Sequence, residues 1–159
     1  MKAHSQQRAN QGFALIAVLA TVLILTGVVT GLSKIAFQNM QFAFNSMMLS
    51  KASFAAEAAV DAAAGMARAN PDQRQISGEI TPYQEGRETI TGSYQLSRVR
   101  ASRFGDSLKG IDPTREVLWV RASGEARRGE NYRRLCRVRA ILLPVQEDKF
   151  VRTLVWTEN

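Results

Sequence analysis

The residues of this chain that are best suited to bind a ligand are arginines. Seven of them fall within 19 residues: Arg121, Arg127, Arg128, Arg133, Arg134, Arg137 and Arg139. Guanidinium groups bind carboxylate and phosphate oxygens, so the cluster predicts a site for DNA or another anionic surface. The alternating pattern around Arg137 and Arg139 puts these two on one exposed strand face. Glu125 and Glu130 lower the charge, and arginines on an outer strand also protect a sheet edge from aggregation, so both interpretations stay open.

Few side chains in the sequence are suited to catalysis. The only histidine is His4, and the only cysteine, Cys136, lies in an alternating apolar pattern that is typical of a buried strand thiol. This content excludes a histidine-dependent triad in the body of the chain and argues against a zinc site. Glu57 and Asp61 are four residues apart and share a helical face, which is more typical of solvated helix charges than of a paired-carboxylate site. We therefore expect no enzyme, no metal and no cofactor.

An uncharged apolar segment near the N-terminus comes before these residues. Phe13–Leu32 supplies 20 residues without a charge, which is the length of a transmembrane helix. A secretory signal peptide is the alternative, but its apolar core has only about 7–15 residues, and residues 33–37 form a poor cleavage site. Lys2 and Arg8 precede the segment, so the positive-inside rule leaves the N-terminus cytoplasmic and the bulk of the chain outside.

The apolar segment continues into a longer helix. Between Lys34 and Ala69 there is no proline, and Pro71 then disfavours helix at the residue before it. We predict one helix of about 55 residues, from Phe13 to about Ala69, which is roughly 80 Å long. Its outer half carries an apolar stripe that we expect to cover a sheet: Phe37, Met40, Phe44, Met47, Met48, Phe54, Ala58 and Ala62.

Beyond the helix, the apolar period changes from about 3.6 to 2. Prolines and glycines predict a loop over residues 70–87. The rest predicts strands at Thr89–Arg100, Glu116–Ser123 and Tyr132–Leu143, a loop at Ser102–Pro113, a turn region at Gly124–Gly129, and a last edge strand at Lys149–Thr157. Short connections favour an antiparallel meander with one buried face. The expected fold is α+β, a long N-terminal helix, membrane-spanning in its first half, packed on a small antiparallel sheet.

The residues around Gly12 and Phe13 follow a known pattern. A basic leader ends in glycine, and the junction reads Gln11-Gly12-Phe13-Ala14-Leu15-Ile16-Ala17-Val18-Leu19. This sequence resembles a type IV prepilin. It is most similar to the PilX group of minor pilins, whose Ala-Phe-x-Ala-Ala-Glu-Ala signature is matched within residues 52–59. The resemblance implies that a prepilin peptidase cuts after Gly12 and N-methylates Phe13.

The resemblance also implies an organisation and a location. The expected parts are a leader at 1–12, a transmembrane and assembly helix at 13–33, its amphipathic continuation at 34–69, and an extracytoplasmic antiparallel β head at 70–159. The chain would cross the inner membrane once, with its N-terminus cytoplasmic, and then enter a periplasmic or extracellular pilus fibre. Its partners would be other pilins, bound through the N-terminal helix, together with the peptidase and the membrane.

The sequence departs from the family pattern at two points. Most pilins carry glutamate at the fifth mature position, facing the N-terminal amine of a neighbour, and here that position is Ala17. A carboxylate in an apolar helix bundle is costly unless it is paired, so a subunit with no neighbour beyond it needs none. We infer a tip or priming role, with a poorly incorporated subunit as the alternative. The second departure is the absence of the disulfide that is common near the C-terminus of pilins, because Cys136 stands alone.

Three functions are consistent with these patterns. The first is a minor pilin or pseudopilin that acts in pilus assembly or adhesion. The second is a pilus-associated subunit that binds DNA or an anionic surface through the basic hairpin. The third is an uncleaved single-pass membrane anchor that keeps its first twelve residues.

Overall fold

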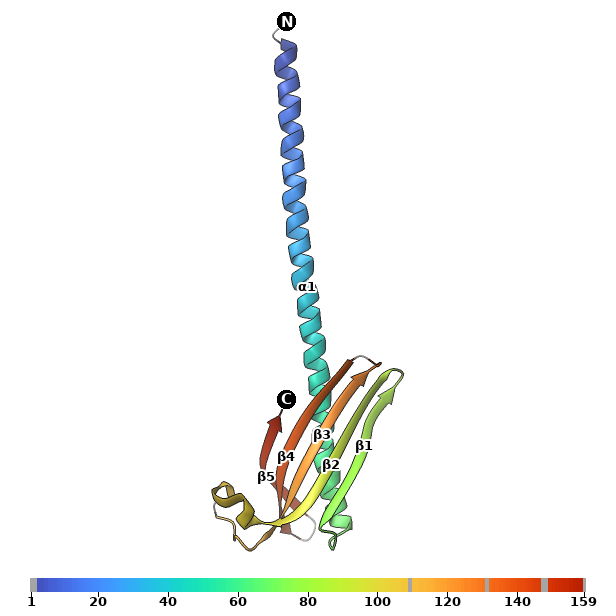
Figure 1. Cartoon of the computed structure of the whole chain (residues 1–159), viewed down its shortest axis with the longest axis vertical. Coiled ribbons are helices and arrows are strands. Elements are labelled where there is room, and N and C mark those ends of the chain that lie inside the picture. The colour runs from blue at the N-terminus through green and yellow to red at the C-terminus, as the bar shows by residue number, and fades with distance from the viewer. Residues whose placement is uncertain (1–2, 109, 131, 147–148, 159) are drawn as a thin grey trace. The chain divides into compact units, whose positions relative to one another are not determined.

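The computed structural model describes residues 3–108, 110–130, 132–146 and 149–158. Its elements in chain order are α1 (Ala3–Ala69), β1 (Gln75–Glu85), β2 (Glu88–Arg100), the 3-10 helix η1 (Ala101–Leu108), β3 (Glu116–Arg128), β4 (Tyr132–Gln146) and β5 (Lys149–Glu158) (Figure 1). The chain divides into two compact units, Met1–Phe44 and Asn45–Asn159, and α1 runs through the boundary between them.

The first unit consists of the N-terminal part of α1. Every side chain described between Ala14 and Ala43 is exposed. The helix already includes residues 3–12, so the predicted start at Phe13 is wrong. Three threonines in the apolar stretch satisfy their hydroxyls within the helix, each donating to the carbonyl oxygen four residues earlier: Thr21 at 2.9 Å, Thr26 at 2.8 Å and Thr30 at 2.7 Å. This segment therefore presents an apolar surface in which the hydroxyls of these three threonines are bonded within the helix.

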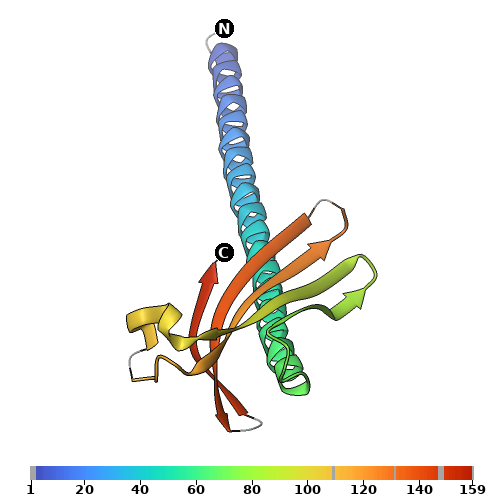
Figure 2. The same cartoon turned by 60° about the horizontal axis from the view of Figure 1, so that its bottom comes forward.

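The strands of the second unit form one antiparallel sheet in the order β1-β2-β3-β4-β5, which is the predicted meander (Figure 2). The predicted edge strand at the C-terminus is confirmed as β5. The loop predicted over residues 70–87 is wrong, because β1 occupies most of it. Pro82 is tolerated there because β1 is an edge strand whose register shifts between Ile80 and Tyr83.

Two further connections differ from their prediction. The turn expected at residues 124–129 is wrong for most of its length, because β3 continues through Gly124 as far as Arg128. The loop expected at residues 102–113 begins as η1, which has a break at Gly105. η1 contributes to a small apolar cluster on the sheet face that α1 does not cover, formed by Ala101, Leu108, Val117 and Ile141.

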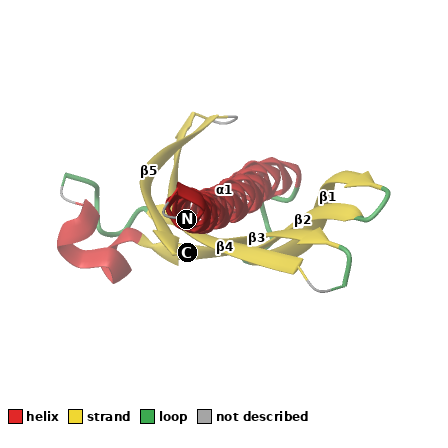
Figure 3. Ribbon diagram, turned by 90° about the horizontal axis from the view of Figure 1, so that it is seen from above, coloured by secondary structure: helices red, strands yellow, loops and turns green. Residues whose placement is uncertain are grey.

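Residues 45–69 of α1 pack on the other face of the sheet (Figure 3). The predicted packing of helix on sheet is confirmed, but the predicted stripe is wrong. Phe54 is 65 % exposed and Met47 is 43 % exposed, and of the predicted residues only Met48 is buried. The sheet is instead covered by small side chains: Ala52, Ala55, Ala56, Ala59, Ala63 and Ala67.

Paired glycines explain why small residues cover the sheet. Gly92 on β2 lies directly opposite Gly124 on β3. A Cβ atom added at Gly92 would lie 2.5 Å from the carbonyl oxygen of Ala55, and one added at Gly124 would lie 1.9 Å from that of Ala52. The backbones of helix and sheet therefore approach so closely that a larger side chain does not fit between them.

Polar contacts fix the helix around this close approach. Lys51 forms an ion pair with Glu88 on β2, and Tyr132 on β4 donates a hydrogen bond to the Asn45 side chain. Near the end of the helix, the Arg98 guanidinium donates to the carbonyl oxygen of Ala67 at 3.0 Å. A cationic donor is favoured at this position because the last carbonyls of a helix lack intrahelical partners and carry partial negative charge.

Candidate functional site

The proposed processing site lies within a helix. Gly12 and Phe13 both belong to α1, although their side chains lie outside the part that the structure describes. Ala17 follows one turn later and is exposed. α1 is long and apolar enough, from Ala14 onward, to cross a membrane by length and composition, and none of its most apolar stretch is buried among the described residues. Within the described residues of the first unit, no other element covers this surface, so lipid or another helix can contact it.

The seven arginines do not form a single surface. β3 and β4 alternate between their two faces, and Ala122, Ala126 and Val138 are buried on the face that α1 covers. Arg128 and Arg134 share the parity of these residues. The other five point to the outer face: Arg121, Arg127, Arg133, Arg137 and Arg139.

Two of the arginines near the hairpin tip, Arg133 and Arg134, contact other side chains of the protein. Arg133 forms an ion pair with Glu125 at 2.7 Å. Arg134 donates to the Asn45 side-chain oxygen at 3.1 Å, and its guanidinium lies 5.3 Å from the centre of the Tyr132 ring. These contacts hold the hairpin to itself and to the helix, so the tip is less available to a ligand than the sequence suggested.

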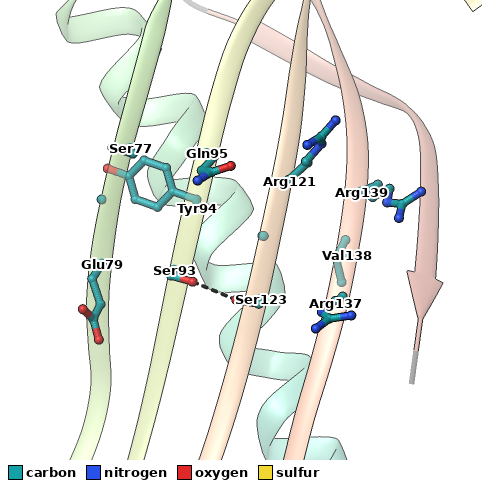
Figure 4. A pocket seen from close by; sticks show the side chains of 12 residues that line it. Ser77, Glu79, Ser93, Tyr94, Gln95, Arg121, Ser123, Arg137, Val138 and Arg139 are labelled. Atoms are coloured by element: carbon teal, nitrogen blue, oxygen red, sulfur yellow. Dashed lines mark hydrogen bonds between the residues drawn. The ribbon is translucent and has the colours of Figure 1, made fainter.

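Three arginines come together in the middle of the outer face. Arg121 on β3 lies directly opposite Arg139 on β4, and Arg137 opposite Ser123 forms the next outward-facing pair (Figure 4). The prediction that Arg137 and Arg139 share an exposed face is confirmed. The Arg121 guanidinium lies 6.0 Å from the centre of the Trp119 ring, within the range of a cation–π contact.

The arginines border a hollow on this face, which we call the outer-face hollow. It has a volume of about 710 Å³, and its polar lining includes Ser77, Glu79, Gln95, Arg121, Arg137 and Arg139. Ser93 and Ser123 also line it and share a hydrogen bond of 2.7 Å between their hydroxyls. A second hollow of about 550 Å³ continues along the sheet and shares Ser77, Gln95 and Arg121 with the first.

The neutral polar part of this lining was missed by the sequence argument. Ser93, Gln95 and Ser97 alternate with buried residues along β2, and this period-2 pattern was the available signal. Their association with Arg121 follows from the strand register, in which Gln95 lies opposite Arg121 and Ser93 opposite Ser123.

The remaining candidate residues from the sequence, Cys136, Glu57 and Asp61, do not come together in a site. Cys136 is completely buried in β4, so its prediction as a buried strand thiol is confirmed. Glu57 and Asp61 are exposed on the helix. Within the described part of the chain, no three His, Cys, Asp or Glu side chains are grouped so that they could hold a metal ion.

Comparison with known proteins gives no relative, because no family model, no curated protein and no solved structure matches the chain. The functional argument therefore rests on two features of the chain itself. These are the uncovered apolar part of α1 and the arginine-lined hollow on the outer face of the sheet.

Proposed function

We propose that this protein is a minor pilin or pseudopilin, a structural subunit for the assembly of a type IV pilus or a related machine. The observation that carries the proposal is the exposure of the apolar helix. Leu23 is 72 % exposed and Ile24 is 68 % exposed, within a charge-free stretch of membrane length. Such a surface needs a cover of lipid or of other apolar helices.

The continuation of the same helix into the head supports this role. A subunit that leaves a membrane and enters a fibre needs an apolar helix that continues into a folded domain. Here α1 extends without interruption to Ala69, and its last part packs on the sheet. The intrahelical bonds of the threonine hydroxyls suit both environments, because neither lipid nor an apolar helix bundle supplies water to solvate them.

The N-terminal pattern supports the finer parts of the proposal. Met1–Gly12 is a prepilin leader, removed by a prepilin peptidase before Phe13 is methylated. The chain then resides in the inner membrane as a single-pass protein and later joins the fibre, where it contributes to assembly or adhesion and catalyses no reaction. Ala17 in place of a glutamate supports a tip or priming position, because a first subunit has no neighbouring amine to pair with.

The mass of the N-terminus tests this proposal. The protein is purified from a native host with and without its prepilin peptidase, and a Gly12→Val variant serves as a control that blocks cleavage. We expect N-methyl-Phe13 as the first residue only when the peptidase is present and Gly12 is intact. An intact leader in every sample would reject the pilin proposal and favour the uncleaved single-pass anchor.

The second candidate, a DNA-binding subunit, has its own test. Alanine replaces the four arginines nearest the hairpin tip in one variant: Arg127, Arg128, Arg133 and Arg134. DNA binding through these residues requires that retention fall and that its salt dependence become shallower. Unchanged retention and slope reject DNA binding through the tip.

A further inference from the structure

The edge strand β1 carries backbone groups that point away from the rest of the sheet. β1 is the first strand in the sheet order and pairs on one side only, with β2. Just before it, the Arg98 N–H donates to the Arg74 carbonyl oxygen at 2.9 Å. Bonded and non-bonded pairs alternate along an antiparallel ladder, so the even-numbered residues that follow bond to β2. The N–H and C=O groups of Gln75, Ser77 and Glu79 therefore point away from β2, and all three residues are exposed.

The two sides of this stretch differ in polarity. On the side that faces α1, Ile76 is buried and Ile80 is half-buried. Between them, Gly78 leaves room for the Tyr94 ring, which reaches from β2 toward β1 (Figure 4). The Tyr94 hydroxyl would lie 2.5 Å from a Cβ atom added at Gly78. The outer side of the stretch carries only polar side chains, so an added strand would meet one apolar row and one polar row.

β1 is an acidic segment of a basic protein. Its sequence contains Glu79 and Glu85 and no lysine or arginine, whereas the whole chain has a formal net charge of +7. The ion pairs found among the described residues belong to other glutamates, Glu88 and Glu125. Two copies of β1 would bring like charges together, so a second copy of this chain is less suited to the edge than a basic strand.

The part of the edge that can pair is short. Pro82 has no N–H, and the register with β2 shifts between Ile80 and Tyr83. Proline and irregular register are both features that keep an edge strand from pairing with another chain. They protect the second half of β1 and leave residues 75–80 as an open ladder, which has the length of one short extended peptide.

We propose that residues 75–80 bind an extended, basic segment of another polypeptide, which adds to the sheet as an antiparallel strand beside β1. Its backbone bonds to the three outward-directed residues, its apolar side chains extend the row of Ile76 and Ile80, and its basic side chains lie beside Glu79. The site lies entirely within the second unit. It therefore requires neither leader cleavage nor fibre assembly, and it is independent of the pilin proposal.

A synthetic peptide tests this inference. The probe is a labelled heptapeptide with blocked ends that alternates lysine and valine. Its affinity for the full chain in phosphatidylcholine nanodiscs is measured by fluorescence anisotropy, with empty nanodiscs as the blank. Two further probes carry backbone N-methyl groups, one on its lysines and the other on its valines, and both keep the charge of the parent. With the valines beside Ile76 and Ile80, only the lysine N–H groups face β1 in an antiparallel ladder.

We expect the parent and the N-methyl-valine probe to bind equally well. The N-methyl-lysine probe should lose about tenfold or more in affinity, because its backbone hydrogen bonds to β1 are removed. Equal binding of both methylated probes would show that charge alone holds the peptide and would overturn the proposal. The reverse preference would reject the antiparallel arrangement, and no binding of the parent would reject the site.

Variants of the chain place the binding at β1. Ser77→Pro removes an N–H that points away from β2 and should lower the affinity about tenfold, whereas Ser77→Ala keeps this N–H and should bind normally. Glu79→Lys leaves the backbone unchanged and should lower the affinity several-fold. Its charge-matched control is Glu116→Lys, at the exposed start of β3, which should change the affinity little.

Hydrogen exchange of the native chain gives a direct readout, because the backbone amides of residues 75–80 should exchange more slowly when the peptide is bound. Equal losses in Glu79→Lys and Glu116→Lys would reduce the effect to net charge and overturn the proposal. A dimer of the native chain that Ser77→Pro dissociates, without any binding of the peptide, would overturn it in favour of a second copy.

Discussion

Gly124 lies where the helix comes closest to the sheet, so an added methyl group there should be costly. We expect Gly124→Ala to lower the free energy of unfolding by about 3 kcal/mol, because its Cβ would meet the Ala52 carbonyl and the backbone at Ala56. Urea unfolding of the full chain in mild detergent, followed by tryptophan fluorescence, measures the loss. The matched control is Gly65→Ala, on the exposed side of the helix with no atom within 4 Å of the added Cβ. It should raise stability by about 0.5–1 kcal/mol. Similar effects of the two changes would contradict the close approach.

Asp112 provides a second residue-scale prediction, in the connection that leads into β3. The Thr114 hydroxyl and backbone N–H donate to one Asp112 carboxylate oxygen at 2.6 and 2.8 Å, and these bonds lower the pKa of Asp112 below 3.8. The ionised form favours the folded loop, so its stabilising effect is complete above pH 3.8 and is lost as the pH falls through the lowered pKa.

The Thr114→Val variant removes the hydroxyl donor, which is the largest cause of the shift. We expect the Asp112 pKa to rise toward its ordinary value, as measured by NMR titration of the carboxyl carbon. Thr81→Val, on the distant strand β1, should leave the Asp112 titration unchanged. An unaltered Asp112 titration in Thr114→Val would show that the hydroxyl has no such role.

At the scale of elements, α1 presents to the sheet a face made mostly of alanines, with Met48 and Val60 among them, and leaves Phe54 exposed. Phe54→Ala should therefore change the free energy of unfolding by less than about 0.5 kcal/mol, as expected for a surface substitution. Ala56→Leu should lower it by about 1–3 kcal/mol, because a larger side chain overpacks the buried face. The same urea titration measures both variants. A larger loss for Phe54→Ala than for Ala56→Leu would instead support the apolar stripe that the sequence predicted.

The misassigned elements have identifiable physical causes. The long helix and the three central strands follow from periods of 3.6 and 2, which report burial on one side. β1 escaped this argument because an edge strand buries little and tolerates proline. β3 was ended too early because Gly124 resembles a turn residue, whereas its role is to admit the helix backbone. Glycine signals a close approach as well as a turn, and a single sequence does not distinguish the two.

The sequence predicted only part of the arginine surface on the outer face of the sheet. Alternation along β4 correctly placed Arg137 and Arg139 on one face. The position of Arg121 opposite Arg139 depends on strand register, which the hairpin connection sets and composition does not report. The exclusion of Arg134 from this face follows from alternation along β4, because Arg134 has the same parity as the buried Val138. The density of arginines along the chain therefore overestimated how many are available to a ligand at the tip of the hairpin. It underestimated how many gather in the middle of the sheet.

At the scale of the whole molecule, the question is where the subunit sits in a fibre. A substitution at Ala17 tests this position. Under the proposed function, Ala17→Glu supplies a carboxylate that can pair with the amine of a neighbouring subunit. A paired charge is tolerated in an apolar bundle and an unpaired one is not. We therefore expect the variant to enter the fibre at internal positions, with several-fold more copies per fibre.

Quantitative mass spectrometry of sheared fibres measures the copy number, and immunogold labelling of the head locates the subunit. The control is Ala20→Glu, which places the same carboxylate nearly one turn further along α1, away from the position that pairs with the amine. It should reduce incorporation, because the charge is then buried without a partner. Native protein at fibre ends and Ala17→Glu along the shaft would support the tip role. Native protein already spread along the shaft would mean that the missing glutamate lowers incorporation without setting position, and the tip role would then be wrong.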